Sequence, residues 1–183
     1  MLICHIIMII YNIVSKEIQD KLSEEILSVN FPWYFNDSTL GEYVKGVDSG
    51  FQFIHTVFDN GNVTSPIFES LKPILQSFEE HTSFQIKNIV RIKINLLTQL
   101  ADSSKQNVIH TDIAKDSPCT SVVSLVYYVM DSDGDTIVYD GNNIVTCSPK
   151  KGTGFYFQSL MEHRATNPIL NQRRIVINFV MEI

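Results

Sequence analysis

The first half of the chain carries two helix-like patterns of apolar and polar positions. Between residues 15 and 29, apolar side chains recur every four positions among charged ones, which predicts an amphipathic helix capped by Ser15. The same spacing returns after Ser65-Pro66 and predicts a second helix that ends near His81, with Ser65 as its cap and the proline in its first turn. Both helices have one apolar face, so we expect them to pack on the outside of a sheet.

The second half changes to strict alternation. From residue 89 to residue 97, apolar and polar side chains alternate with period two, as on a strand with two different faces. One earlier strand is expected at 51–58, and the segment 36–50 between the first helix and this strand is expected to be a loop. Further short strands are predicted at 108–112, 120–130, 137–139, 144–147, 154–157 and 174–180.

Helices followed by many short antiparallel strands predict an α+β, mainly β fold. The architecture expected from this pattern is a sandwich or jelly roll supported by N-terminal helices. A chain of 183 residues has the length of one domain. We therefore expect a single domain over 1–183, with helical support at about 15–81 and a jelly-roll core at about 89–183.

Composition narrows the classes of partner. A net charge of −6 disfavours an electrostatic binder of nucleic acid or of anionic membranes. Lys87, Arg91 and Lys93 form a local basic stripe, which we expect to be a solvated strand face. The apolar run Met1–Ile10 is too short to span a bilayer and lacks the flanks of a signal peptide, so it predicts a buried first strand. The odd number of cysteines, three, fits a reducing compartment. Together these features predict a soluble cytoplasmic protein.

Three side chains of metal-binding type stand near the ends of predicted strands: His110, Asp112 and His163. His110 and Asp112 are two positions apart, so on a strand they share one face. Two neutral imidazoles and one carboxylate leave coordination positions open, which suits non-haem Fe(II). A basic residue about ten positions after His163, Arg173 or Arg174, can hold the far carboxylate of a co-substrate.

The segment from Arg91 to Phe179 resembles the 2-oxoglutarate- and Fe(II)-dependent oxygenases, and in particular the prolyl 4-hydroxylase branch and its compact phage and bacterial forms. Two departures are visible. Asn95 or Leu97 stands where a tyrosine often faces the co-substrate, and Asp-Gly-Asp-Thr replaces the usual Gly-Gly-x-Thr. The pieces that carry the resemblance are His110-Thr111-Asp112, Val126-Tyr127-Tyr128, Gly134-Asp135-Thr136, Pro149-Lys150-Lys151-Gly152, Phe155-Tyr156-Phe157 before His163, and the last strand, Arg174 to Phe179.

The resemblance implies a double-stranded β-helix (jelly roll, cupin-like), with a catalytic jelly-roll core at about 89–183. It also implies a catalytic iron centre and a hydroxylase (dioxygenase) activity. In the family, the residues matching His110, Asp112 and His163 bind Fe(II), 2-oxoglutarate is the co-substrate with O2, and succinate and CO2 are released. Ascorbate is a candidate reductant. The presence of the Asp112 carboxylate favours hydroxylation over halogenation, because halogenating relatives lack this ligand.

The resemblance also assigns residues to 2-oxoglutarate. We favour Arg174 over Arg173 for its far carboxylate, because Arg174 places Val176 and Asn178 on the inward face, where family members often carry a polar residue. Tyr128 is expected to donate a hydrogen bond to the same carboxylate. The substrate is not specified: a protein, a peptide or a small molecule is favoured over nucleic acid, no membrane partner is expected, and the oligomeric state is open.

Two other classes remain. The chain can be a non-catalytic double-stranded β-helix that binds a metal or a partner as a structural module. A cupin enzyme is the third reading, but cupins gather three histidines and a glutamate, and the strand-spaced histidine pair of that pattern is absent.

Overall fold

Two antiparallel sheets face each other in the computed structural model, which describes residues 6–40, 50–101, 107–117 and 121–183. The larger sheet runs in the order β1 (Ile7–Ile10), β9 (Gly154–Gln158), β6 (Val122–Tyr128), β11 (Arg173–Glu182), β5 (Asn88–Thr98), β3 (Gln52–Asp59) and β2 (Tyr34–Asn36), and β4 (Asn62–Val63) pairs with β3. The smaller sheet runs β10 (His163–Ala165), β7 (Thr136–Asp140), β8 (Asn143–Cys147). The predicted α+β, mainly β jelly roll is confirmed.

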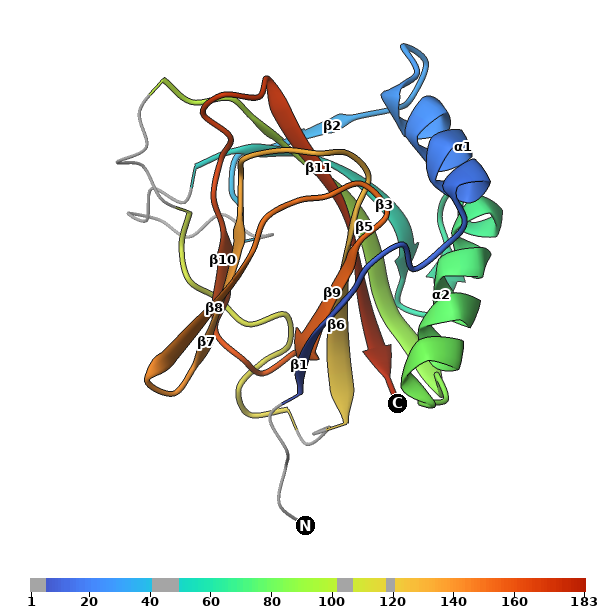
Figure 1. The fold of residues 1–183 in the computed structure, drawn as a ribbon, viewed down its shortest axis with the longest axis vertical. Coiled ribbons are helices and arrows are strands. Elements are labelled where there is room, and N and C mark those ends of the chain that lie inside the picture. Colours follow the sequence, from blue (N-terminus) through green and yellow to red (C-terminus); the bar gives the residue numbers. More distant parts are fainter. Residues whose placement is uncertain (1–5, 41–49, 102–106, 118–120) are drawn as a thin grey trace.

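The two helices, α1 (Lys16–Leu27) and α2 (Phe68–Thr82), cover the outer face of the larger sheet (Figure 1). Ser15 caps α1 as expected, since its hydroxyl accepts from the backbone N–H of Ile18 at 3.4 Å. The predicted cap at Ser65 is wrong. Its hydroxyl instead lies 2.7 Å from Nε2 of buried His55, and α2 begins three residues later without a side-chain cap.

The central strands β6 and β11 are buried on both faces. On β11, Ile175, Ile177 and Phe179 point toward the helices and belong to the core between helices and sheet. The alternate position Val176 points between the two sheets, into a second core. The same alternation on β6 sends Leu125 toward the helices and the residues on either side of it into the barrel. One face of each central strand therefore packs against the helices, and the other face lines the barrel interior.

Two residues of the expected basic stripe, Arg91 and Lys93, do not lie on a solvated strand face. In the register of β5 against β11, Lys93 is opposite Asn178 and Arg91 is opposite Val180, so both side chains lie on the barrel side of the sheet. The side chain of Arg91 is 27% exposed. Lys87 precedes the strand and is exposed. The solvated-face prediction is therefore wrong for Arg91 and Lys93.

Two predicted strands differ in kind from the expectation. Residues 108–112 do not form a regular strand, and His110 makes an isolated bridge to His163. The first strand, β1, is an edge strand paired only with β9, and Met8 on it is 54% exposed. The loop predicted at 36–50 lies partly outside the described residues, and Cys4 and Cys119 lie outside them.

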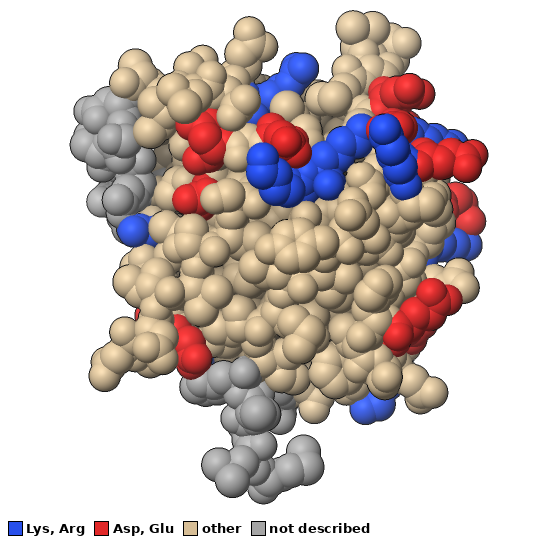
Figure 2. Space-filling view, in the orientation of Figure 1, with Lys and Arg blue, Asp and Glu red and all other residues tan. Residues whose placement is uncertain are grey.

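The surface charges shown in Figure 2 are mixed in sign. Basic and acidic side chains lie next to one another along the upper part of this face, and its centre carries uncharged residues. Within the described ranges, no helix is long and apolar enough to cross a membrane.

Candidate metal centre

The two histidines are placed by the main chain. The backbone N–H of His110 donates to the carbonyl of His163, and that of His163 donates back to His110, each at 2.9 Å. The imidazole centroids lie 4.4 Å apart. Asp112 follows on the same segment, and its N–H donates to the carbonyl of Ser159 at 3.1 Å. Backbone hydrogen bonds therefore bring the three ligands together, although 108–112 is not a regular strand.

Hydrogen bonds fix the tautomer of both imidazoles. Nδ1 of His110 lies 3.1 Å from the carbonyl oxygen of Val108, and Nδ1 of His163 lies 3.0 Å from that of Met161. A carbonyl oxygen can only accept, so Nδ1 carries the proton in each ring and Nε2 presents its lone pair. The ligand atoms of His110, Asp112 and His163 all lie within 4.8 Å of one another, a spacing consistent with one shared ion.

The carboxylate of Asp112 has different surroundings at its two oxygens. Oδ1 accepts from Nη2 of Arg91 at 2.9 Å and from Nδ2 of Asn178 at 3.0 Å, which occupies both of its lone pairs. Oδ2 accepts from the hydroxyl of Ser124 at 2.6 Å and lies 3.5 Å from Nε2 of His163. One lone pair of Oδ2 is left on the side of the histidines. The geometry therefore favours Asp112 as a monodentate ligand through Oδ2.

The protonation states suit a metal. Burial alone would raise the pKa of Asp112, but His163, Arg91 and the hydrogen bond from Ser124 outweigh it and hold that pKa at about 2. Burial lowers the pKa of His163, against the opposing effect of Asp112. A divalent metal needs an ionised carboxylate and neutral imidazoles, and the lowered pKa values of Asp112 and His163 favour these forms.

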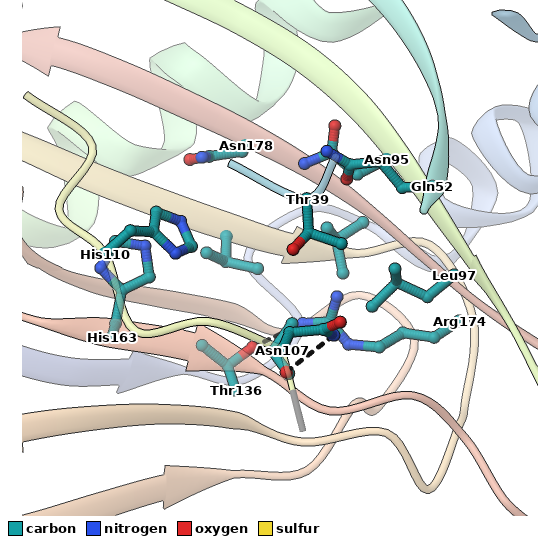
Figure 3. Close-up of a pocket in the computed structure, with 13 residues that line it drawn as sticks. Thr39, Gln52, Asn95, Leu97, Asn107, His110, Thr136, His163, Arg174 and Asn178 are labelled. Atoms are coloured by element: carbon teal, nitrogen blue, oxygen red, sulfur yellow. Dashed lines mark hydrogen bonds between the residues drawn. The ribbon is translucent and has the colours of Figure 1, made fainter. Parts of the chain in front are cut away.

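A cavity of about 70 Å³, here called the co-substrate cavity, runs from the histidines to Arg174 (Figure 3). Arg174 is 3% exposed, and its Nε donates to the carbonyl of Gly134 at 2.7 Å. Its Nη2 donates to Oγ1 of Thr136 at 2.6 Å. Burial lowers the pKa of Arg174. Within the described part of the chain, no carboxylate lies at ion-pair distance from this guanidinium, so the cavity offers a buried cation suited to an anionic ligand.

The other residues predicted for 2-oxoglutarate occupy three different positions. Arg173 is exposed and points away from the cavity, on the opposite face of β11 from Arg174. Tyr128 is fully buried but does not line the cavity: its hydroxyl oxygen lies 2.9 Å from Oγ1 of Thr136 and 3.2 Å from the carbonyl of Cys147. Asn178 lines the cavity and donates to Asp112. Direct contacts of Tyr128 and Asn178 with 2-oxoglutarate stay predictions.

Sequence reasoning missed three residues of the site. Thr136 stands in the quoted Gly-x-Thr piece, but no role was attached to it. Ser124 interrupts an otherwise apolar strand, and this interruption could have indicated a functional role. In the structure its hydroxyl donates a hydrogen bond to Asp112. Arg91 is in phase with Lys93 on β5, opposite in phase to apolar Ile92, and this alternation could have indicated an inward polar row.

Comparison with known proteins gives a result for structure only. No family model matches the sequence, and no curated protein matches it. A 2OG-Fe(II) oxygenase family oxidoreductase from Burkholderia pseudomallei has a TM-score of 0.73 and 14% identity, over 96% of this chain and 84% of that one. A prolyl hydroxylase from Trichoplax adhaerens, in complex with a hypoxia inducible factor peptide fragment, has a TM-score of 0.69 and 14% identity, over 96% and 83%.

A third solved structure is the epimerase SnoN in complex with Fe3+, alpha ketoglutarate and nogalamycin RO. It has a TM-score of 0.66 and 10% identity, over 96% of this chain and 78% of that one. These similarities confirm at the level of the fold the resemblance to 2-oxoglutarate/Fe(II) oxygenases, prolyl hydroxylases included, and their double-stranded β-helix.

Proposed function

We propose that the protein is a 2-oxoglutarate-dependent Fe(II) dioxygenase that hydroxylates its substrate. The observation that carries this proposal is the pairing, across one cavity, of the His110, Asp112 and His163 cluster with the buried guanidinium of Arg174. A metal site alone needs no buried cation at the far end of the cavity. A dianionic co-substrate that reaches from a metal to an arginine explains both ends.

Each residue has a role that follows from its contacts. His110 and His163 would offer Nε2, and Asp112 would offer Oδ2, to Fe(II). When bound, iron and 2-oxoglutarate supply the oxidising chemistry, with O2 consumed and with succinate and CO2 released. Ascorbate would serve as an external reductant.

Arg174 would bind the far carboxylate of 2-oxoglutarate, and Thr136 would orient the guanidinium through the bond to Nη2. Tyr128 would hold Thr136 in place from behind. Ser124, Arg91 and Asn178 leave Asp112 a single free lone pair toward the histidines, which fixes the direction of that ligand.

The test is an anaerobic titration of the purified protein with Fe(II) and then 2-oxoglutarate. We expect 2-oxoglutarate to bind only after the metal and to give the weak visible charge-transfer band of a keto acid chelated to Fe(II). The His110→Ala variant should lose the metal and the band. Admission of air should then yield succinate from the wild-type protein.

The matched pair Arg174→Met and Arg173→Met tests the far end of the cavity. We expect 2-oxoglutarate affinity to fall by at least about tenfold in Arg174→Met, because a charge-assisted hydrogen bond is lost, and to stay unchanged in Arg173→Met. Metal binding without 2-oxoglutarate binding in the wild-type protein would overturn the proposal in favour of a non-catalytic metal-binding module.

A further inference from the structure

A second cavity of about 70 Å³, here called the polar cavity, lies beside the metal ligands. Asp112, His110 and Thr111 line one part of it, and the inward row of β5 lines another. It shares Asn95, Asn178 and Gln52 with the co-substrate cavity, and Figure 3 shows these three amides together on one side of that cavity. The polar cavity therefore adjoins the proposed reaction centre without being the path to Arg174.

The two positive charges of the polar cavity come from Arg91 and Lys93. Nη2 of Arg91 donates a hydrogen bond to Asp112, whereas its Nε is buried and has no hydrogen-bond partner among the described residues. Lys93 is half-buried, and within the described part of the chain no hydrogen bond or ion pair holds its ammonium group. Burial lowers the pKa of Lys93 and neighbouring Arg91 acts in the same direction, against the opposing effect of the Asp59 and Asp112 carboxylates.

A half-buried lysine beside a half-buried arginine is unfavourable without a counterion. Asp112 is a counterion for Arg91, but in the proposed function it faces a divalent metal, and its charge is needed there. The metal dication, the Asp112 carboxylate, the 2-oxoglutarate dianion and the Arg174 cation sum to zero. Asp59, opposite Arg91 in the pairing of β3 with β5, brings one negative charge near Arg91 and Lys93. The pair then keeps one positive charge that no carboxylate of the described residues balances.

The cavity also carries buried hydrogen-bond acceptors without partners. Oδ1 of Asn95 and Oδ1 of Asn178 are buried and unpaired among the described residues. Such atoms are expensive to leave unsatisfied. A ligand that brings an anion for Lys93 and a donor group for these amides would satisfy the whole lining.

We propose that the polar cavity binds the substrate through an anionic group, a carboxylate or a phosphate, with Lys93 as its main contact and Arg91 as the second. The inference rests on the proposed function and defines its substrate class as anionic. It assigns to Lys93 a specificity role, distinct from the metal ligands and from Arg174. The carboxylate and phosphate forms share this chemistry and are separated by the probes below.

The experiment uses probe pairs that differ in one charged group. N-acetyl amino acids are compared with their C-terminal amides, and glycerol phosphate is compared with glycerol. Each is titrated calorimetrically into the protein saturated with Mn(II), as a redox-silent metal, and with 2-oxoglutarate, which occupies Arg174. Lys93→Met removes the charge, Lys93→Gln is a second neutral variant, and Lys87→Met is the control at an exposed lysine outside the cavity.

We expect at least one anionic member to bind about tenfold or more tightly than its neutral partner, as a charge-assisted contact provides. Both Lys93 variants should abolish this preference and Lys87→Met should keep it. The pair that shows the preference identifies carboxylate or phosphate. Equal binding of both members, no binding of either, or a preference that survives in Lys93→Met and Lys93→Gln would overturn the inference.

Two further readouts separate this inference from the proposed function. Binding of Mn(II) and 2-oxoglutarate is measured in the same titrations, and its failure counts against the oxygenase alone. The titrations of the probe pairs are then repeated on the metal-free Arg174→Met variant. Anion binding lost in Arg174→Met but kept in Lys93→Met would place the anion in the co-substrate cavity and overturn the role of Lys93.

Discussion

Ser124 donates a 2.6 Å hydrogen bond to Oδ2 of Asp112, the oxygen that also faces His163. The same hydroxyl lies 2.8 Å from Oγ of Ser159, whose backbone carbonyl accepts from the N–H of Asp112. Two strand ends thus fix the orientation of one carboxylate. Mutation of a residue that orients a metal ligand typically costs about 10–100-fold in metal affinity.

We predict that Ser124→Ala weakens binding of Fe(II) or Mn(II) by about tenfold, because Asp112 loses the donor that aims Oδ2. Calorimetric titration of the metal measures this. Ser121→Ala, at an exposed serine just before the same strand, is the control and should bind metal like the wild type. Equal affinities for Ser124→Ala and Ser121→Ala would contradict the orienting role.

The metal-free protein should depend on the charge of Asp112 for stability. Its pKa of about 2 lies below the ordinary 3.8, so the unfolded chain takes up the proton first as the pH falls. The carboxylate therefore stabilises the fold above about pH 4, and this contribution, about 2 kcal/mol, is lost as the pH falls through 2.

Asp112→Asn is the variant that tests this dependence. Urea unfolding should show a deficit of about 2 kcal/mol relative to wild type at about pH 6, and a clearly smaller one at about pH 3. A deficit that does not change between the two pH values would show that lost packing, not the charge, accounts for it.

Tyr128→Phe distinguishes direct from indirect support of Arg174. Since the Tyr128 hydroxyl bonds to Thr136 and Cys147 and does not line the cavity, we expect a stability loss of about 1 kcal/mol and a drop in 2-oxoglutarate affinity smaller than that of Arg174→Met. Tyr139→Phe, on β7 of the smaller sheet, is the control. If Tyr128→Phe weakened 2-oxoglutarate binding as much as Arg174→Met, direct contact would be the better account.

Gly134 leaves room for Arg174. A Cβ at this position would lie 2.6 Å from the carbonyl oxygen of Thr166 and 2.9 Å from Cδ of Arg174. Gly134→Ala should therefore destabilise the protein by about 1–3 kcal/mol and weaken 2-oxoglutarate binding, because the guanidinium must shift.

Thermal unfolding and 2-oxoglutarate titration measure the two effects of Gly134→Ala. Gly141→Asn is the matched control: this hairpin glycine has φ +60° with nothing near its Cβ position, and asparagine tolerates that conformation. Normal 2-oxoglutarate binding by Gly134→Ala would show that Arg174 does not depend on this space.

Much of the fold and of the candidate site can be predicted from the sequence, because the features concerned depend on the local periodicity of apolar and polar residues. Alternation on the last strand distinguishes Arg174 from Arg173, and the structure has Arg174 in the cavity with Ile175 and Ile177 packed against the helices. The helix at 16–27 and its Ser15 cap follow from four-residue spacing and one hydroxyl. These features involve neighbours in sequence, so a pattern along the chain contains them.

The features that escape prediction depend on distant partners. Arg91 and Lys93 look like a solvated stripe until β11 is paired with β5 and the stripe turns inward. Ser65 looks like a helix cap, but its hydroxyl instead bonds to His55 on strand β3. The convergence of His110 on His163 is made by backbone bonds between separate segments, whereas the sequence offered only a strand that does not form.

That backbone bridge has a consequence for engineering. His110 and His163 are joined N–H to carbonyl in both directions, and neither of these two bridging hydrogen bonds involves an imidazole. Replacing His110 or His163 with glycine should leave a cavity of the size and shape of an imidazole, while the backbone around it keeps its position. Free imidazole added to the solution should then bind in that cavity and take the place of the missing ligand. The ligand of the metal can in this way be exchanged by adding a different small molecule, without a further mutation.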